Sequence, residues 1–298
     1  MAKDGVSEDA EQSLMLSSVL FLYQYGYKDD IINEMGRTGR MQITVLTENT
    51  AAEESFGKEH GLSLYIRTRE RRILFDMGQT GLFLENARKL DLDLGEVELA
   101  VLSHGHYDHG GGLPEFLKIS SRAKVYVSRF AFQPHYHGPE RYIGLDPGLA
   151  GSPRLVFTGD QEELGPGLTL YSCNQKQRER NLGSFGLQTR ENGRFVPDDF
   201  RHEQYLLIEE QGRRVLFSGC SHKGILDIVR WFRPDVLVGG FHFSKLPLDE
   251  TLEEYARYLD GFPTEYYTCH CTGLSQFEYM SRFMKRLHYL SAGETVSD

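Results

Sequence analysis

The sequence predicts an α/β protein in which two β-sheets pack face to face and helices cover their outer surfaces. Three observations support this fold class. From Met41 onward, short apolar strands come first and are followed by helices that alternate with strands. The second half of the chain repeats that order. Polar side chains of the metal-ligand type follow several strands, as expected at the sheet edge that forms the site in layered α/β proteins.

In the first half, short apolar runs bounded by polar turns predict strands. Leu82, Leu84, Ala87 and Leu90 stand at helical spacing among polar residues and predict a helix. The elements expected here, in chain order, are strands at 42–47, 62–67 and 72–75, a helix at 82–90, a strand at 97–102, a helix at 113–119 and a strand at 124–127.

The second half follows the same pattern within one domain, residues 41–298. Its expected elements are strands at 154–157, 168–171, 205–209 and 215–218, a helix at 224–232, a strand at 236–238, a helix at 252–259, a strand at 265–268 and a terminal helix at 275–287. Between the halves, residues 130–153 are rich in Gly, Pro, His and Tyr and show little periodicity. A loop of this length is usually functional or mobile, so we expect a lid.

Residues 1–40 predict an N-terminal extension with a helix over 12–35 that ends at Gly36 and Gly39. Its apolar stretch, 14–25, is too short to span a bilayer. Acidic residues precede this stretch, whereas a secretory signal begins with basic ones. We therefore expect neither a membrane partner nor secretion.

The composition argues against a nucleic-acid partner. The 298 residues include 33 Lys and Arg against 43 Asp and Glu, a net charge of -10, and nucleic-acid binding needs a basic surface. An acidic protein still binds a small anionic molecule where a metal supplies local positive charge. Four cysteines in a chain of this length do not indicate a disulfide scaffold, so we expect the reducing cytoplasm. The sequence indicates no particular oligomeric state.

The strongest motif follows the predicted strand 97–102. Residues 103–112 read Ser-His-Gly-His-Tyr-Asp-His-Gly-Gly-Gly, which places His104, His106, Asp108 and His109 on a short turn. Neutral imidazole and carboxylate are ligands that Zn²⁺ takes, and the glycines let the backbone fold around an ion. The motif therefore predicts a metal site at the end of this strand.

Other candidate residues follow other predicted strands, and we expect them to converge on the same edge. They are Asp76, Cys220, His222, His242 and His270.

Taken together, Asp76, the segment 103–111, the turn Gly-Cys-Ser-His at 219–222 and the late His-Cys-Thr-Gly at 270–273 resemble the metallo-β-lactamase superfamily. The segments 47–51, 59–63 and 73–76 resemble the branch that is similar to the dihydropterin–ribofuranosylaminobenzene phosphate synthases. The resemblance covers about residues 41–287. It implies a four-layer αββα sandwich with a metal site on one edge.

The resemblance also implies a ligand set. His104 and His106 would hold one metal, Asp108, His109 and His270 a second, and Asp76 would orient the ligand loop. Many relatives place a bridging aspartate where this chain has Cys220, which is either a thiolate ligand or a small buried thiol. We take His222 to complete the first site, with His202 as the alternative.

The implied cofactor is one or two Zn²⁺ ions, with iron or manganese as alternatives. Zinc lowers the pKa of its bound water to about 7, which gives metal-bound hydroxide at neutral pH. We assign Asp108 the catalytic task of orienting that hydroxide.

We assign substrate contacts to four further residues. Lys223 precedes the predicted helix 224–232, whose free backbone N–H groups would help to hold a phosphate, although a solvated lysine explains it equally well. His135 and His137 lie in the predicted lid, where ordinary packing is the alternative, and Tyr107 lies within the histidine motif.

The leading hypothesis is a metal-dependent hydrolase that acts on a small anionic substrate, a phosphate ester or phosphodiester. The alternative from the resemblance is a transferase that condenses a pterin pyrophosphate with an arylamine ribotide. A third class is a non-hydrolytic diiron or ligand-binding protein. The intact His-x-His-x-Asp-His set argues against a degenerate site.

Overall fold

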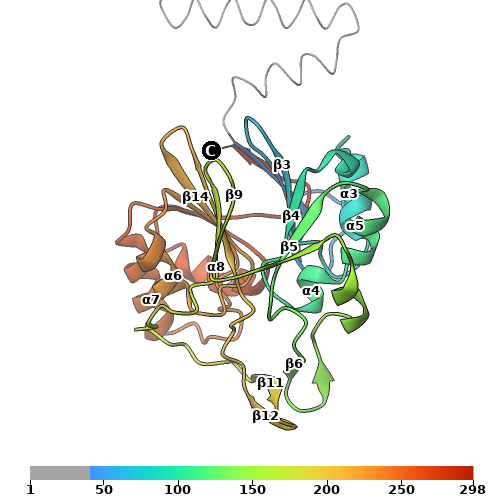
Figure 1. The fold of residues 1–298 in the computed structure, drawn as a ribbon. Helices are drawn as coiled ribbons and strands as arrows, with labels where there is room; N and C mark the ends of the chain where they lie inside the picture. The colour runs from blue at the N-terminus through green and yellow to red at the C-terminus, as the bar shows by residue number, and fades with distance from the viewer. Residues whose placement is uncertain (1–40, 298) are drawn as a thin grey trace, which may run out of the picture.

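The computed structural model describes residues 41–297, and two seven-stranded sheets packed face to face form their centre (Figure 1). The first sheet has the order β18-β1-β2-β3-β4-β5-β8. Its strands are β1 (Gln42–Thr47), β2 (Ser63–Arg67), β3 (Arg72–Phe75), β4 (Leu99–Val101), β5 (Lys124–Ser128), β8 (Leu155–Thr158) and β18 (Thr295–Ser297).

The second sheet has the order β17-β16-β15-β14-β13-β10-β9. Its strands are β9 (Gln161–Gly165), β10 (Leu168–Tyr171), β13 (Tyr205–Glu210), β14 (Arg213–Ser218), β15 (Val236–Gly239), β16 (Glu265–Thr268) and β17 (Leu287–Tyr289). In each sheet one part is antiparallel and the other is parallel. The carboxyl ends of the parallel strands therefore point to one edge in each sheet.

Helices cover the outer face of each sheet, as the sequence predicts (Figure 1). α3 and α5 cover the first sheet, and α6, α7 and α8 cover the second. The helices are α3 (Leu82–Lys89), α4 (Tyr107–Gly110), α5 (Leu113–Ile119), α6 (Ile225–Phe232), α7 (Glu250–Asp260) and α8 (Leu274–Met280), with short 3₁₀ turns at Leu94–Glu96, Pro147–Gly151 and His270–Thr272. The predicted layered α/β architecture is confirmed.

The main core lies between the two sheets. Alternate residues of the strands point inward, because successive side chains of a strand face opposite sides. Phe75 of β3 meets Phe217 of β14 across this core, with ring centroids 5.8 Å apart and both side chains fully buried. Because each of these residues precedes a loop that carries candidate ligands, the contact also fixes those loops relative to each other.

A third, smaller sheet takes two of its four strands from the segment that the sequence predicts to be a lid loop. Its order is β12-β11-β6-β7, with β6 (His135–His137), β7 (Arg141–Tyr142), β11 (Leu187–Glu191) and β12 (Arg194–Pro197). β6 and β7 thus give residues 130–153 regular structure, held by pairing with β11. Movement of this segment as a lid stays a prediction.

The expected terminal helix over 275–287 is wrong in its second half. α8 ends at Met280, and Leu287 begins β17, which pairs with Tyr266 of β16. Met280, Met284 and Leu287 are buried in the same cluster and stand at helical spacing in the sequence. They belong, however, to the end of α8, to the turn that follows it and to β17, so the spacing alone wrongly indicated one helix. The helix expected at 12–35 lies outside the described residues.

Within residues 41–297, no helix combines the length and apolar character needed to cross a membrane.

Replacing Phe75 by alanine tests the contact between the sheets. We expect the free energy of unfolding to fall by about 3–5 kcal/mol, because the change leaves a cavity opposite Phe217. Phe157→Ala is the matched control, since Phe157 is 47% exposed on β8, and it should cost less than about 1 kcal/mol. Urea unfolding followed by circular dichroism measures both values. Equal losses would contradict a core that joins the two sheets here.

Candidate metal centre

Five segments that follow strands meet at one edge of the sandwich. They come after β3, β4, β14, β15 and β16 and supply Asp76, the histidine motif, Cys220 with His222, His242 and His270. Asp76, Ser221, His242 and His270 have positive φ values of 59°, 58°, 57° and 49°. This left-handed backbone costs a non-glycine residue about 1–2 kcal/mol. Such strained residues gather at functional sites, so the clustering supports the predicted site.

Asp76, which follows β3, holds the loop that follows β4 through hydrogen bonds to Ser103 and His109. Its Oδ1 accepts a hydrogen bond from the Ser103 backbone N–H at 2.7 Å, and its Oδ2 accepts from the Ser103 hydroxyl at 2.7 Å and from His109 Nδ1 at 2.6 Å. The carboxylate is fully buried, so these three donors replace its water.

These hydrogen bonds determine which ring nitrogen of His104 and of His109 carries the proton. The Ser103 hydroxyl donates to Asp76, so it accepts from His104 Nδ1–H at 2.8 Å. The unprotonated Nε2 atoms of His104 and His109 then point inward, where His104 Nε2 lies 3.3 Å from His222 Nε2 and His109 Nε2 lies 3.1 Å from Cys220 Sγ. Asp76 therefore holds two imidazoles with an unprotonated nitrogen turned inward, the orientation that metal binding requires.

His270 is oriented in the same way by Asn49. His270 Nδ1 donates to Asn49 Oδ1 at 2.9 Å, and the Glu48 carboxylate accepts the His270 backbone N–H. His270 Nε2 is left buried and without a hydrogen bond, 3.4 Å from Asp108 Oδ2. An unsatisfied buried nitrogen beside a carboxylate oxygen fits a site that takes a cation.

The ligand atoms form several overlapping groups, and two of them share His104. His104, His106 and His222 offer ligand atoms within 4.8 Å of one another, and so do His104, His109 and Cys220. Among the described residues, His106 Nε2 and His222 Nδ1 are also buried without a partner. Burial lowers the pKa of His104, His106 and His222 well below its ordinary value, which keeps these rings neutral as metal binding requires.

Asp108 is held ionised at the edge of this cluster. Burial opposes the charge, but the adjacent imidazoles of His270 and His60 outweigh it and hold the pKa of Asp108 well below its usual value. His60 Nε2 lies 3.1 Å from Asp108 Oδ2. For His109, burial is likewise outweighed, here by Asp76, which raises its pKa.

Cys220 lies inside the cluster, between the two groups of histidines. Its Sγ also groups within 4.8 Å with ligand atoms of His222 and His242, and with those of His270 and Cys271. Burial raises the pKa of the Cys220 thiol, so a cation must lie beside it for the thiolate to form. The position fits a thiolate ligand between two ions.

The structure separates the two histidines that we considered for the first site. His202 Nδ1 accepts the Gly105 backbone N–H at 2.9 Å, so in a neutral ring the proton sits on Nε2, which faces Asp198 Oδ2 at 3.5 Å. Burial lowers the pKa of His202 to about 4, so the ring is neutral. In this tautomer His202 has no free lone pair, although one of its nitrogens lies within 4.8 Å of ligand atoms of His106, His135 and Asp198. His222, whose ligand atom groups with those of His104 and His106, fits the first site.

Lys223 and His135 do not reach the cavity, in contrast to our expectation. Lys223 is buried, and its ammonium group donates to the backbone carbonyls of Ser172 and Glu203, both at 2.7 Å. His135 is buried behind His106, with Nδ1 2.7 Å from Asp198 Oδ2. Both side chains are used inside the fold and are not available to a substrate.

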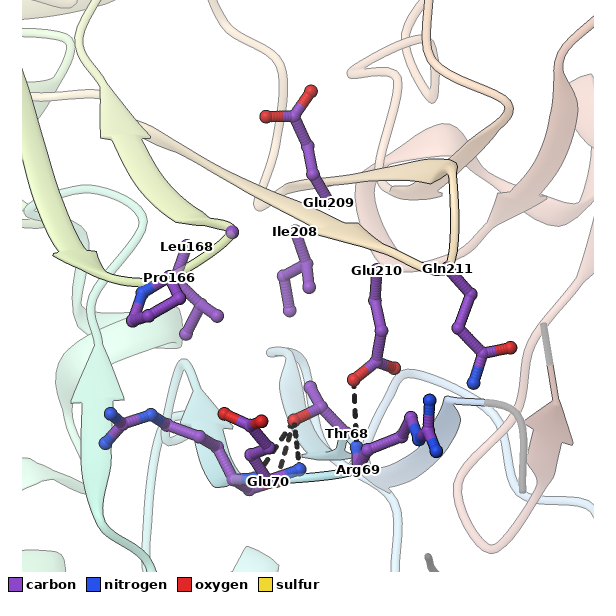
Figure 2. Close-up of a pocket in the computed structure, with 11 residues that line it drawn as sticks. Thr68, Arg69, Glu70, Pro166, Leu168, Ile208, Glu209, Glu210 and Gln211 are labelled. Carbon is purple, nitrogen blue, oxygen red and sulfur yellow. Dashed lines mark hydrogen bonds between the residues drawn. The ribbon is translucent and has the colours of Figure 1, made fainter. Parts of the chain in front are cut away.

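A cavity of about 310 Å³ opens over the ligands. Tyr107 and His137, two predicted substrate contacts, line it together with Asp108, Cys220 and His270. A larger cavity of about 700 Å³ lies between the turns β2–β3, β9–β10 and β13–β14 (Figure 2). It contains Arg69, Glu70 and Glu210 but no histidine or cysteine, and those turns lie at the opposite end of the sandwich (Figure 1). Because this larger cavity lacks metal-ligating histidines and cysteines, we do not assign it as the active site.

Three residues near the ligands were absent from our predicted set. Asn49 and Glu48 position His270, and His60 contacts Asp108. They lie in the segment between β1 and β2, which carries no metal-ligand spacing. Only their similarity to the family motifs at 47–51 and 59–63 marked them.

Comparison with known proteins agrees with this geometry. The family model described as the metallo-β-lactamase superfamily matches residues 57–261. An uncharacterized protein of Methanocaldococcus jannaschii, MJ0448, is 28% identical over 80% of this chain and 94% of its own length. The 7,8-dihydropterin-6-methyl-4-(β-D-ribofuranosyl)-aminobenzene-5'-phosphate synthase of the same organism is 26% identical over 89% of this chain and 99% of its own.

A solved structure gives a stronger match. The crystal structure of Tm1679, described as a metal-dependent hydrolase of the β-lactamase superfamily, is 32% identical with a TM-score of 0.73. The match covers 87% of this chain and all of that one. This chain therefore resembles the Tm1679 protein in both sequence and fold over most of its length.

Replacing Asp76 by asparagine tests whether its carboxylate orients the histidine motif for metal binding. The amide keeps the shape but presents an NH₂ group to one of three donors, so we expect zinc affinity to fall about 10- to 100-fold. Competition with a chromophoric chelator measures the affinity. Asp227→Asn is the control, because Asp227 is equally buried but bonds to Arg180 and Arg230. Zinc binding by Asp76→Asn as tight as in the unchanged protein would refute the assignment.

Proposed function

This chain belongs to the metallo-β-lactamase superfamily, and we propose that it is a hydrolase that acts on a small phosphate ester or phosphodiester with the help of one or two zinc ions. The observation that carries the proposal is the convergence of imidazole, carboxylate and thiol groups from both sheets on one cavity. The fixed protons of His104, His109 and His270 support it further, because each ring turns an unprotonated nitrogen inward.

We assign the ligands by their grouping. His104, His106 and His222, whose ligand atoms group together, would hold one ion. The family resemblance assigns Asp108, His109 and His270 to the other, and Cys220 Sγ groups with ligand atoms of His104 and His109 and with those of His270 and Cys271. When bound, zinc would lower the pKa of a coordinated water and polarise the oxygen of the bond to be broken. Imidazole, carboxylate and thiolate together are a ligand set that suits zinc.

The protein's own groups position the reactants. Asp108 Oδ2 faces His60 and His270, which leaves Oδ1 to accept a hydrogen bond from the attacking water. Asp76 and Asn49 hold the rings rigid, so little reorganisation is needed during the reaction.

We further propose that the enzyme works in the cytoplasm. All four cysteines are free thiols, and three of them are buried. Free thiols are typical of a reducing compartment.

Replacing His106 by alanine tests the metal site. We expect loss of metal and of turnover, with an unchanged far-ultraviolet circular dichroism spectrum, because the ring lies at the site and outside the main core. Elemental analysis and release of p-nitrophenol from bis(p-nitrophenyl) phosphate measure the two effects. His288→Ala, on the exposed side of β17, should change neither. Full activity of the His106→Ala protein would overturn the assignment.

The second candidate function is a transferase, and the match to the Methanocaldococcus synthase favours it. Its substrate would carry a pyrophosphate leaving group, and an aryl amine would take the place of water as the attacking group.

The hydrolase and the transferase differ in the substrates that turnover requires. We expect zinc-loaded protein to hydrolyse a generic phosphodiester without any amine acceptor, since the proposed attacking group is water. Phosphate-ester cleavage followed by chromatography measures this. Turnover that requires both a pterin pyrophosphate and an arylamine ribotide would instead establish the transferase.

A further inference from the structure

Two cationic side chains stand at the mouth of the metal cavity. Arg141 belongs to β7 of the small sheet, and Lys245 lies in the segment after β15. Both are exposed, and both line the cavity whose base is formed by Asp108, Cys220 and His270. Segments more than 100 residues apart in the chain thus bring positive charge to one opening.

Neither cation is neutralised by a carboxylate within residues 41–297. Arg141 Nη2 donates to the Tyr107 hydroxyl at 2.9 Å, and Lys245 Nζ lies 3.3 Å from His137 Nε2. Burial, Lys245 and Arg141 all lower the pKa of His137, so the two charges act on the same small region. In a chain with a net charge of -10, a pair of uncompensated cations over a metal site creates a local positive field.

One part of the cavity wall is apolar. Ile143 and Leu187 line it and pack with Phe200 and Tyr107 in one cluster. A ligand in this cavity therefore meets metal donors at the base, an apolar wall and a cationic rim. At about 310 Å³, the cavity suits a small molecule.

We propose that Arg141 and Lys245 bind the phosphoryl group of a substrate whose organic part packs against Ile143 and Leu187. This proposal rests on the proposed function and names the side chains that select its substrate. A guanidinium group offers two parallel N–H donors to phosphoryl oxygens, and the ammonium group adds a second full charge. Two cations match the doubly charged phosphoryl group of a phosphate monoester better than a singly charged phosphodiester or carboxylate. Arg141 and Lys245 would thus supply the positive charge for phosphate binding that the sequence analysis assigned to Lys223.

Binding of phenylphosphonate to the zinc-loaded protein, measured by calorimetry, tests the rim. This probe carries an aryl group and a phosphoryl group and has no ester bond to hydrolyse. We expect Arg141→Gln and Lys245→Gln each to weaken binding by roughly tenfold, since hydrogen bonds to charged groups are worth that much. The double variant should lose more, while zinc content stays unchanged. Benzoate should bind at least roughly tenfold more weakly than phenylphosphonate.

The matched control removes the same two charges elsewhere. Lys118→Gln with Arg122→Gln changes one residue at the end of α5 and one just after it, away from the cavity, and should leave phenylphosphonate affinity unchanged. An equal loss in the control and the rim variants would overturn the proposal, and so would absence of phenylphosphonate binding in the unchanged protein. Benzoate binding as tight as phenylphosphonate would overturn the assignment to a phosphoryl group.

The same variants separate this proposal from the proposed function. If the unchanged protein binds phenylphosphonate through Arg141 and Lys245 but cleaves no phosphate ester, the rim is supported and the hydrolase proposal fails. If it cleaves esters and the rim variants retain the KM of the unchanged protein, the hydrolase stands and the rim is wrong.

Discussion

The structure of the metal centre depends on the buried carboxylate of Asp76. Each of its oxygens is already engaged by a donor on the histidine loop, so the group cannot turn without losing several hydrogen bonds at once. A buried charge is tolerated only where such donors replace water. The same bonds decide which nitrogen of His104 and His109 carries a proton. One residue thus sets both the path of the loop and the ligand chemistry.

Burial acts on the neighbouring groups in a complementary way. It keeps three histidines neutral, so they are ready to ligate a cation, and it keeps Cys220 protonated until a cation arrives. Asp108 stays ionised, because the imidazoles of His60 and His270 lie beside its Oδ2. Three neutral histidines and an ionised carboxylate thus meet at the site, and Arg141 and Lys245 bring positive charge to its exposed rim.

The sequence predicted the parts of the fold that rest on local pattern. Strands in the two main sheets show apolar runs, and the histidine motif is compact enough to be recognised without long-range information. Convergence of Asp76, Cys220 and His270 followed from the rule that parallel strands end at one edge. β11 and β12 were missed, because their exposed residues lack a clear apolar alternation.

Errors at the site came from contacts that only the folded chain contains. Lys223 bonds to the carbonyl of Ser172, 51 residues away, so no local pattern marks it as buried. His104 and His222, which adjoin in the site, are 118 residues apart and belong to opposite sheets. An ion held by both, as we propose, would close a very long loop, as a disulfide would, and would join the two halves of the sandwich. Binding of such an ion would stabilise the folded protein, because each half of the chain, taken alone, contains only part of the proposed ligand set.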